Sequence, residues 1–354
     1  MKKFLLNLAK FISIPLIILS VVIFVYVKRD IYQDFGPYDN YSWTYRVQTM
    51  GDLSTKKLLN SKTKYDSFIF GSSRAISVYA CYLQQKLKGS KFFHYANWGE
   101  SIGGIYEKLN LIDSLGYDIK NVFIYIDTDD TFNGGGKCLP GDHYLLTKQD
   151  KFDYYFEHFK GFLSQEDLLK IMLGKKLNYY AAPDWDSDPV TNDGRHHCSD
   201  STVLAEYGVN KKGTKQHDRR IDSLKNTGVL YDRQNTQKVT EKQISPNEEK
   251  LLEKIKILFD KHKTKYYIVI TPIYDMAKFE ESDLKILKDI FGDNLYDFSG
   301  ENKYTLDEYN YNDMSHFQYY ITKEIIDSVV ADHAVNPDLR PVSSENSPAD
   351  SMSH

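Results

Sequence analysis

The first 29 residues are apolar on every face of a helix. From Phe4 to Val27 polar residues are few, two lysines precede the run, and Lys28 and Arg29 follow it. As a helix this stretch would be about 36 Å long, enough to cross the hydrocarbon core of a bilayer. No small-x-small cleavage pattern follows it. The pattern predicts an uncleaved signal anchor with the N-terminus inside and the body outside, against the alternative of a buried helix in a soluble domain.

Beyond residue 64, short apolar runs alternate with amphipathic segments. The runs rich in β-branched and aromatic residues, read as strands, are 65–71, 91–95, 121–126, 265–271 and 295–298. The amphipathic segments, read as helices, are 78–87, 101–115, 246–262, 282–290 and 318–330. A strand followed by a helix, repeated along the chain, predicts an α/β domain with a parallel sheet and helices on both faces.

Two helix starts carry capping signals. Ser101 precedes the segment whose apolar residues Ile105, Leu109 and Ile112 share one face. Ser245 precedes Pro246, which is favoured in the first turn of a helix. Both helices are therefore expected to begin directly after these serines.

The pattern divides the chain into four parts. Residues 1–29 are the expected anchor, and 30–64 form a membrane-proximal linker. Residues 65–335 form the α/β domain, with an insertion at about 130–242 that breaks the rhythm and is expected to cap the carboxyl edge of the sheet. Residues 336–354 are rich in Ser, Pro and Asp and are expected to be disordered.

Composition narrows the classes of function. The 354 residues carry a net charge of −4, and the first 29 hold five basic residues and no acid, so the rest is more acidic still. This argues against nucleic acid as a partner. Cys81, Cys138 and Cys198 are too scattered for a disulfide framework, although Cys138 and Cys198 could pair in an oxidising compartment.

Three short segments place reactive side chains after predicted strands. Gly71-Ser72-Ser73-Arg74 follows the first strand, and Asn97-Trp98-Gly99 follows the second. Asp313-Met314-Ser315-His316 stands near the carboxyl end, where the carboxylate can orient the imidazole. A serine, a histidine and an aspartate form a nucleophilic triad if these loops converge.

Together these segments resemble the SGNH, or GDSL-type, hydrolase superfamily. Its nucleophile stands in a Gly-x-Ser turn, which matches Ser73, and its last block is Asp-x-x-His, which matches Asp313 and His316. The resemblance implies a flavodoxin-like three-layer α/β/α sandwich, and an oxyanion hole formed by the amides of Ser73 and Gly99. The anchor and the GSSR segment look more like the membrane-tethered branch that includes D-alanyl-lipoteichoic acid biosynthesis and alginate O-acetylation proteins.

One block departs from the family pattern. The family usually has Gly-x-Asn-Asp after the third strand, with the Asn donating to the oxyanion, whereas this chain has Asp127-Thr128-Asp129-Asp130. A carboxylate there would oppose the developing negative charge. Either Asn97, Arg74, Thr128 or Asn133 supplies the donor, or the site is weakened or inactive.

Each candidate residue also has a structural interpretation. Ser73 could cap the following helix, and Asp313 could cap the last helix with His316 in its first turn. Arg74 could bind an anionic substrate group or pair with an acid. Asp129 could bind substrate or simply form a turn.

These patterns predict a membrane-anchored extracytoplasmic serine esterase or O-acyltransferase. Its substrate would be an acyl ester of a cell-envelope polysaccharide or related polymer, and a membrane acyltransferase is a candidate partner. No cofactor and no metal are expected, because the cluster at 195–198 lacks regular ligand spacing. The competing hypothesis is an inactive binding or scaffold module of the same fold, beside a membrane acyltransferase or polymer exporter.

Overall fold

The body of the protein is built on a five-stranded parallel sheet. The computed structural model describes residues 2–35, 50–165, 168–173, 188, 190–193, 215–233 and 238–335. The strands are β1 (Ser67–Phe70), β2 (Phe92–His94), β3 (Asn121–Ile126), β4 (Lys265–Ile270) and β5 (Leu295–Asp297). They lie in the order β2-β1-β3-β4-β5, and every neighbouring pair is parallel. The predicted α/β class with a parallel sheet is confirmed.

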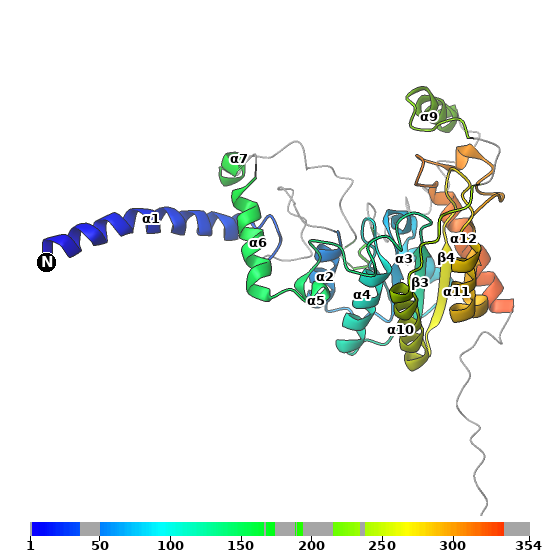
Figure 1. The fold of residues 1–354 in the computed structure, drawn as a ribbon, viewed down its shortest axis with the longest axis horizontal. Coiled ribbons are helices and arrows are strands. Elements are labelled where there is room, and N and C mark those ends of the chain that lie inside the picture. The colour runs from blue at the N-terminus through cyan, green and yellow to red at the C-terminus, as the bar shows by residue number, and fades with distance from the viewer. Residues whose placement is uncertain are drawn as a thin grey trace, which may run out of the picture.

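Helices cover both faces of this sheet (Figure 1). One face carries α4 (Ile102–Ser114), α10 (Pro246–His262) and α11 (Glu281–Phe291). The other carries α3 (Ala80–Lys86) and α12 (Tyr319–Val335). Helix α9 (Lys215–Asn226) stands beyond the end of the sheet and contributes Ile221 to the core on this side. Short 3₁₀ turns η1 (Ser73–Ser77), η3 (Gly292–Asn294) and η4 (Glu308–Asn310) connect the elements.

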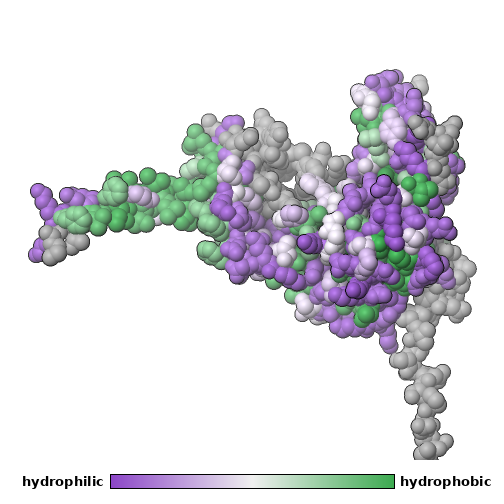
Figure 2. Space-filling view, in the orientation of Figure 1, coloured by the Kyte–Doolittle hydropathy of each residue, from purple (hydrophilic) through white to green (hydrophobic). Residues whose placement is uncertain are grey.

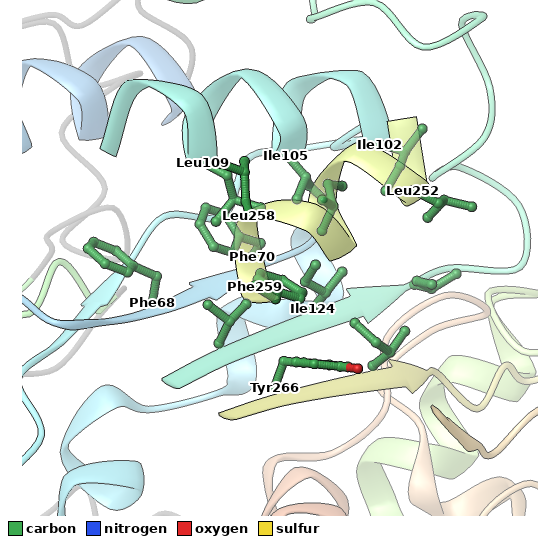
Figure 3. Close-up of a cluster of buried hydrophobic side chains, with 14 of the residues drawn as sticks. Phe68, Phe70, Ile102, Ile105, Leu109, Ile124, Leu252, Leu258, Phe259 and Tyr266 are labelled. Atoms are coloured by element: carbon green, nitrogen blue, oxygen red, sulfur yellow. The ribbon is translucent and has the colours of Figure 1, made fainter. Parts of the chain in front are cut away.

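Alternate strand residues point into two separate cores. Phe68, Phe70 and Ile124 pack with α4 and α10, as Figure 3 shows for the side chains around Phe259. Ile69 and Phe123 point the opposite way, toward α3 and α12. Because successive side chains of a strand point to opposite faces, a strand apolar at every position must be covered on both sides. This is why β1 and β3 are hydrophobic at every position after their first residues, Ser67 and Asn121.

The predicted helix starts at Ser101 and Ser245 are confirmed. The Ser101 hydroxyl accepts a hydrogen bond of 3.0 Å from the Gly104 amide. Ser245 forms a capping box with Glu248, in which each side chain bonds the other residue's backbone amide. These caps fix where α4 and α10 begin, and therefore how they lie on the sheet.

The N-terminal helix α1 (Lys2–Arg29) extends away from the body (Figures 1 and 2). Its segment Lys10–Arg29 has a mean hydropathy of 2.5 and is long and apolar enough to span a membrane. Phe11 and Phe24 are 74% and 63% exposed, so this helix is not the buried core helix of a soluble domain. The span is assigned by length and composition.

The described part of the region between α1 and the sheet contains a helix and a buried lysine. Residues 30–64 include α2 (Met50–Asn60), in which Lys56 is buried. The Lys56 ammonium lies 2.7 Å from an Asp34 oxygen and 2.8 Å from an Asp52 oxygen. His158, from a later helix, lies 2.9 Å from Asp34. This buried ionic network joins the exit of α1 to the body, and the sequence pattern did not predict it.

The expected insertion contains helices α5 (Tyr144–Thr147), α6 (Lys151–Leu163) and α7 (Leu168–Met172) besides α9. Of these, α6 and α7 pack against α1. The tail 336–354, the cluster at 195–198 and the proposed Cys198 partner of Cys138 lie outside the described residues.

Candidate active site

Ser73, His316 and Asp313 form a hydrogen-bonded triad. The Ser73 hydroxyl oxygen lies 2.7 Å from Nε2 of His316. Nδ1 of the same ring lies 2.9 Å from each carboxylate oxygen of Asp313. In this arrangement the imidazole can accept the serine proton at one nitrogen while the carboxylate holds the other.

Ser73 is positioned by a sharp turn after β1. Gly71 has φ of 145°, and a Cβ there would lie 2.9 Å from the Tyr125 Cβ and 3.0 Å from the Tyr125 carbonyl oxygen. Only glycine fits this turn without displacing β3. The hydroxyl of Ser72 accepts from the Arg74 amide and caps η1. Ser72 therefore has the capping role considered for Ser73, whose hydroxyl faces His316.

The loop that carries the other two residues is held by its own hydrogen bonds. A backbone bond of 2.7 Å joins the Asn312 amide to the His316 carbonyl. The Asp313 carboxylate accepts bonds of 2.8 Å from the amides of Ser315 and His316. Helix α12 begins only at Tyr319, so Asp313 is not its cap and His316 is not in its first turn. The loop, rather than a helix, orients the pair.

These contacts also set the charge of Asp313. Burial disfavours its ionised form, but the hydrogen bonds from the His316 ring and the Ser315 amide outweigh burial and lower the pKa of this carboxyl. Asp313 is therefore ionised at neutral pH. An ionised carboxylate stabilises the imidazolium that forms when His316 takes a proton.

Arg74 pairs with the acidic block after β3. Its guanidinium bonds Asp129 through both terminal nitrogens, at 2.5 and 2.8 Å, and lies 3.1 Å from Asp127. Burial opposes the charge on Arg74, but Asp127 and Asp129 outweigh burial and raise its pKa. The same pairing lowers the pKa of Asp129 against the effect of burial. Both carboxylates are paired to this one cation, which offsets one of their two negative charges.

The buried carboxylate of Asp127 connects several parts of the candidate site. Besides Arg74 it accepts hydrogen bonds from Ser72 and, at 3.0 Å, from the Thr271 hydroxyl. It thereby ties the turn after β1 to the ends of β3 and β4. Arg74 adds a bond of 2.7 Å from Nε to the Ser315 carbonyl. The sequence pattern pointed to Asp127 only as part of the departing block and assigned no role to Ser315. The only sequence signal for either residue was its position beside candidate site residues.

Two backbone amides are available as oxyanion donors. Ser73 is the first residue of η1, where an amide has no partner within the helix. Gly99 stands in an open turn with φ of 58°, and an added Cβ would meet no atom within 4 Å. No acceptor among the described residues bonds either amide. Beside Gly99, the Trp98 side chain is 44% exposed.

The four other candidate oxyanion donors differ in whether their donor groups already have hydrogen-bond acceptors. The Asn97 amide group donates to Asp142 at 2.9 Å, while its oxygen accepts from the Gly51 amide at 3.0 Å. The Arg74 guanidinium is occupied as described above, and the Asn133 side chain donates to the Asp129 carbonyl. The Thr128 hydroxyl is buried and lacks a hydrogen-bond partner among the described residues. Among these four candidates, Thr128 is thus the one whose donor group has no hydrogen-bond acceptor among the described residues.

Comparison with known proteins adds nothing beyond this geometry. No protein-family model matches the chain, and no curated protein matches it significantly in sequence. Within the described residues, no group of three or more His, Cys, Asp or Glu side chains is arranged to hold a metal ion. The site therefore has to be interpreted from its own residues.

Proposed function

We propose that the protein is a membrane-anchored serine esterase or O-acyltransferase of the SGNH type. The observation that carries the proposal is the continuous hydrogen-bonded chain from Ser73 through His316 to Asp313. Neither sequence separation nor local capping requires these three side chains to meet. Their order and distances suit nucleophilic acyl transfer.

In the proposed reaction the Ser73 oxygen attacks the acyl carbon while Nε2 of His316 takes the hydroxyl proton. The amides of Ser73 and Gly99 stabilise the negative charge on the carbonyl oxygen. The ester bond breaks, the leaving oxygen receives the proton from His316, and an acyl-serine remains. Water or a hydroxyl of an acceptor then attacks this ester and gives its proton to His316. The bond between the acyl carbon and the Ser73 oxygen breaks, His316 returns the proton to that oxygen, and the acyl group leaves as the free acid or as the ester of the acceptor.

The fold supports the same proposal. The strand order β2-β1-β3-β4-β5 is that of flavodoxin-like three-layer folds, in which sites lie beyond the carboxyl ends of the strands. Ser73 and Asp127 both follow strand ends there. With α1 as the anchor, we place the body on the extracytoplasmic side, where a cell-envelope polysaccharide or related polymer would be the acyl donor or acceptor. A membrane acyltransferase is the partner that such chemistry would need.

A binding or scaffold module of the same fold is the second candidate. The acidic block favours it, because Asp127 and Asp129 occupy the segment where the related hydrolases have an oxyanion donor. Their pairing with Arg74 weakens this argument, since a paired carboxylate opposes an oxyanion less than a free one.

The deciding experiment is active-site labelling of the full chain in detergent micelles. A fluorophosphonate should label the wild-type protein and the control variant Ser114→Ala, whose serine lies in α4. It should not label Ser73→Ala, and Ser73→Ala and His316→Ala should both lose hydrolysis of 4-nitrophenyl acetate. A folded wild-type protein that is neither labelled nor faster than Ser73→Ala would refute the hydrolase and favour the binding module.

A further inference from the structure

Helix α6 lies across the end of α1 and exposes an apolar stripe (Figure 1). Phe152, Phe156 and Leu163 are 74%, 46% and 43% exposed. With Phe159 they follow the spacing of four, three and four residues that places side chains on one helix face. Beyond α6, Leu169 of α7 and the adjacent Leu173 are 70% and 61% exposed. We call Phe152, Phe156, Leu163, Leu169 and Leu173 the exposed stripe.

The stripe faces the side from which α1 arrives. Phe159 lies on the same face of α6, between Phe156 and Leu163, and packs against Tyr26 of α1 with ring centroids 5.3 Å apart. The opposite face of α6 is turned to the body, where the Tyr154 hydroxyl bonds Asp52 and His158 bonds Asp34. The exposed side chains are therefore on the membrane side of the helix, if α1 spans the bilayer.

The depth of the contact indicates what covers the stripe. Val22 and Val25 of α1 pack against the cluster that contains Phe162 and Ile171. At about 1.5 Å per residue, Val22 lies roughly 10 Å before Arg29 along the helix axis. Both valines belong to the segment apolar enough to span a membrane. The end of α6 and α7 thus stand beside a level of α1 that lipid would surround.

Charges flank the stripe where a headgroup layer would lie. The Arg29 guanidinium donates a hydrogen bond of 3.3 Å to the Met172 carbonyl oxygen. This bond places the end of α7 level with the end of α1. Lys170 stands between the exposed leucines of α7, and Lys151 begins α6. Apolar side chains on one face and lysines beside them are typical of helices that lie in the membrane interface.

We infer that α6 and α7 lie in the interface of the same bilayer that α1 spans, with the exposed stripe inserted at the boundary between headgroups and acyl chains. The ligand is the lipid surface itself. This inference rests on the proposed anchoring by α1. It implies that the body contacts the membrane at two places, α1 and the exposed stripe. Two contacts fix the orientation of the body relative to the membrane, whereas α1 alone would fix only its distance from it.

The test is spin-label accessibility of the full chain in vesicles of phosphatidylcholine and phosphatidylglycerol. Single cysteines replace Phe156 or Leu169 in a background without Cys81, Cys138 and Cys198, and circular dichroism checks that each variant folds. Collisions with oxygen report lipid, and collisions with a water-soluble nickel chelate report water. Ile17→Cys in α1 is the lipid control, and Glu157→Cys, on a different face of α6, is the matched aqueous control.

The expected result is that labels at Phe156 and Leu169 resemble Ile17, with an oxygen-to-nickel ratio several times that of Glu157. If Ile17 reports lipid while Phe156 and Leu169 resemble Glu157, the inference is wrong and the anchor stands. Labels shielded from both reagents would show a protein partner on the stripe, which also overturns the inference. If Ile17 itself reports water, the proposed anchoring fails first.

Discussion

Nε of Arg74 donates a hydrogen bond of 2.7 Å to the carbonyl oxygen of Ser315, the residue before His316. Arg74 follows the candidate nucleophile directly in the chain. One side chain therefore fixes the distance between the turn that carries Ser73 and the loop that carries His316. The same guanidinium pairs with Asp127 and Asp129 and offsets one of their two charges, so the geometry of the candidate site and its local charge depend on a single residue.

Replacing Arg74 by Met should destabilise the protein by about 3 kcal/mol, because removing one partner leaves Asp127 buried without its cation. Urea unfolding of the full chain in detergent measures this. Arg74→Lys should lose less, since a point charge keeps the pairing but not the bidentate geometry. A midpoint for Arg74→Met equal to that of the wild type would contradict the buried-pair argument.

Asp313→Asn should leave stability nearly unchanged and reduce ester turnover by about 10²- to 10⁴-fold. The amide oxygen can still accept from the Ser315 and His316 backbones, but it no longer stabilises a charged imidazole. Steady-state kinetics and thermal unfolding separate the two effects. Asp313→Ala, which also removes the loop bonds, is expected to lose stability as well. Equal turnover in Asp313→Asn and wild type would remove Asp313 from the triad.

The lowered pKa of Asp313 has a consequence for the acid side of the pH profile. This carboxyl stays ionised below the usual aspartate range, so it does not limit activity between pH 5 and 7. Activity should be lost through Asp313 only at a pH below the usual aspartate range, and Asp313→Asn, which has no carboxyl to titrate, should lack that loss. A pH–rate profile of kcat/KM measures this; the same loss in Asp313→Asn would show that another group causes it.

The sequence predicted the sheet and the triad because both depend on local signals. Strand 121–126 was predicted to the residue, since the five unbroken apolar positions after Asn121 are typical of a strand covered on both faces. The Gly-x-Ser turn and the Asp-x-x-His loop are likewise short. The sequence left undecided whether Arg74 binds substrate or pairs with an acid. Its pairing with Asp127 and Asp129 could not be predicted, because it depends on the register of β1 against β3.

The buried ionic network around Lys56 could not be predicted from the sequence, for a different reason. Residues 30–64 are polar enough to suggest a linker, and a buried lysine has the same sequence signature as an exposed one. Only the ion pairs of Lys56 with Asp34 and Asp52 make its burial tolerable, and Asp34 is in turn held by His158, more than a hundred positions away. The exposed stripe of α6 was missed because its partner face also consists of aromatic residues.

Gly71→Ala should cost about 3 kcal/mol or more and abolish labelling of Ser73, because the new methyl would overlap Tyr125 in β3. Gly116→Ala is the matched control. It also has positive φ, 72°, but an added Cβ meets no atom within 4 Å, so about 1 kcal/mol is expected. Chemical denaturation measures both. Equal losses would show that backbone conformation alone, rather than the close approach to β3, requires the glycine.

His94 should make stability depend on pH. Burial lowers the pKa of this imidazole to about 4, against its hydrogen bond of 2.8 Å to the Ala75 carbonyl. In the unfolded chain the ordinary value is about 6.5, so between these values the unfolded state binds a proton that the folded state does not. The contribution of His94 is complete above pH 6.5. It falls by up to about 3 kcal/mol as the pH drops to 4.

His94→Gln should therefore flatten the dependence of unfolding free energy on pH across that window, whatever it costs at pH 7. Part of the slope should remain, because burial also lowers the pKa of His143 to about 4. Urea unfolding at several pH values gives the slope. An identical slope in the variant would mean that His94 is protonated in the folded protein.

The hydrogen bond between Ser73 and His316 joins positions 243 residues apart. During synthesis the serine and its turn leave the ribosome long before the loop that carries the imidazole. A nascent or truncated chain ending before Asp313 has the hydroxyl without its base, and Arg74 without its contact to Ser315. Under the proposed function, reactivity is thus acquired only when the polypeptide is complete, because the candidate base lies on its last loop.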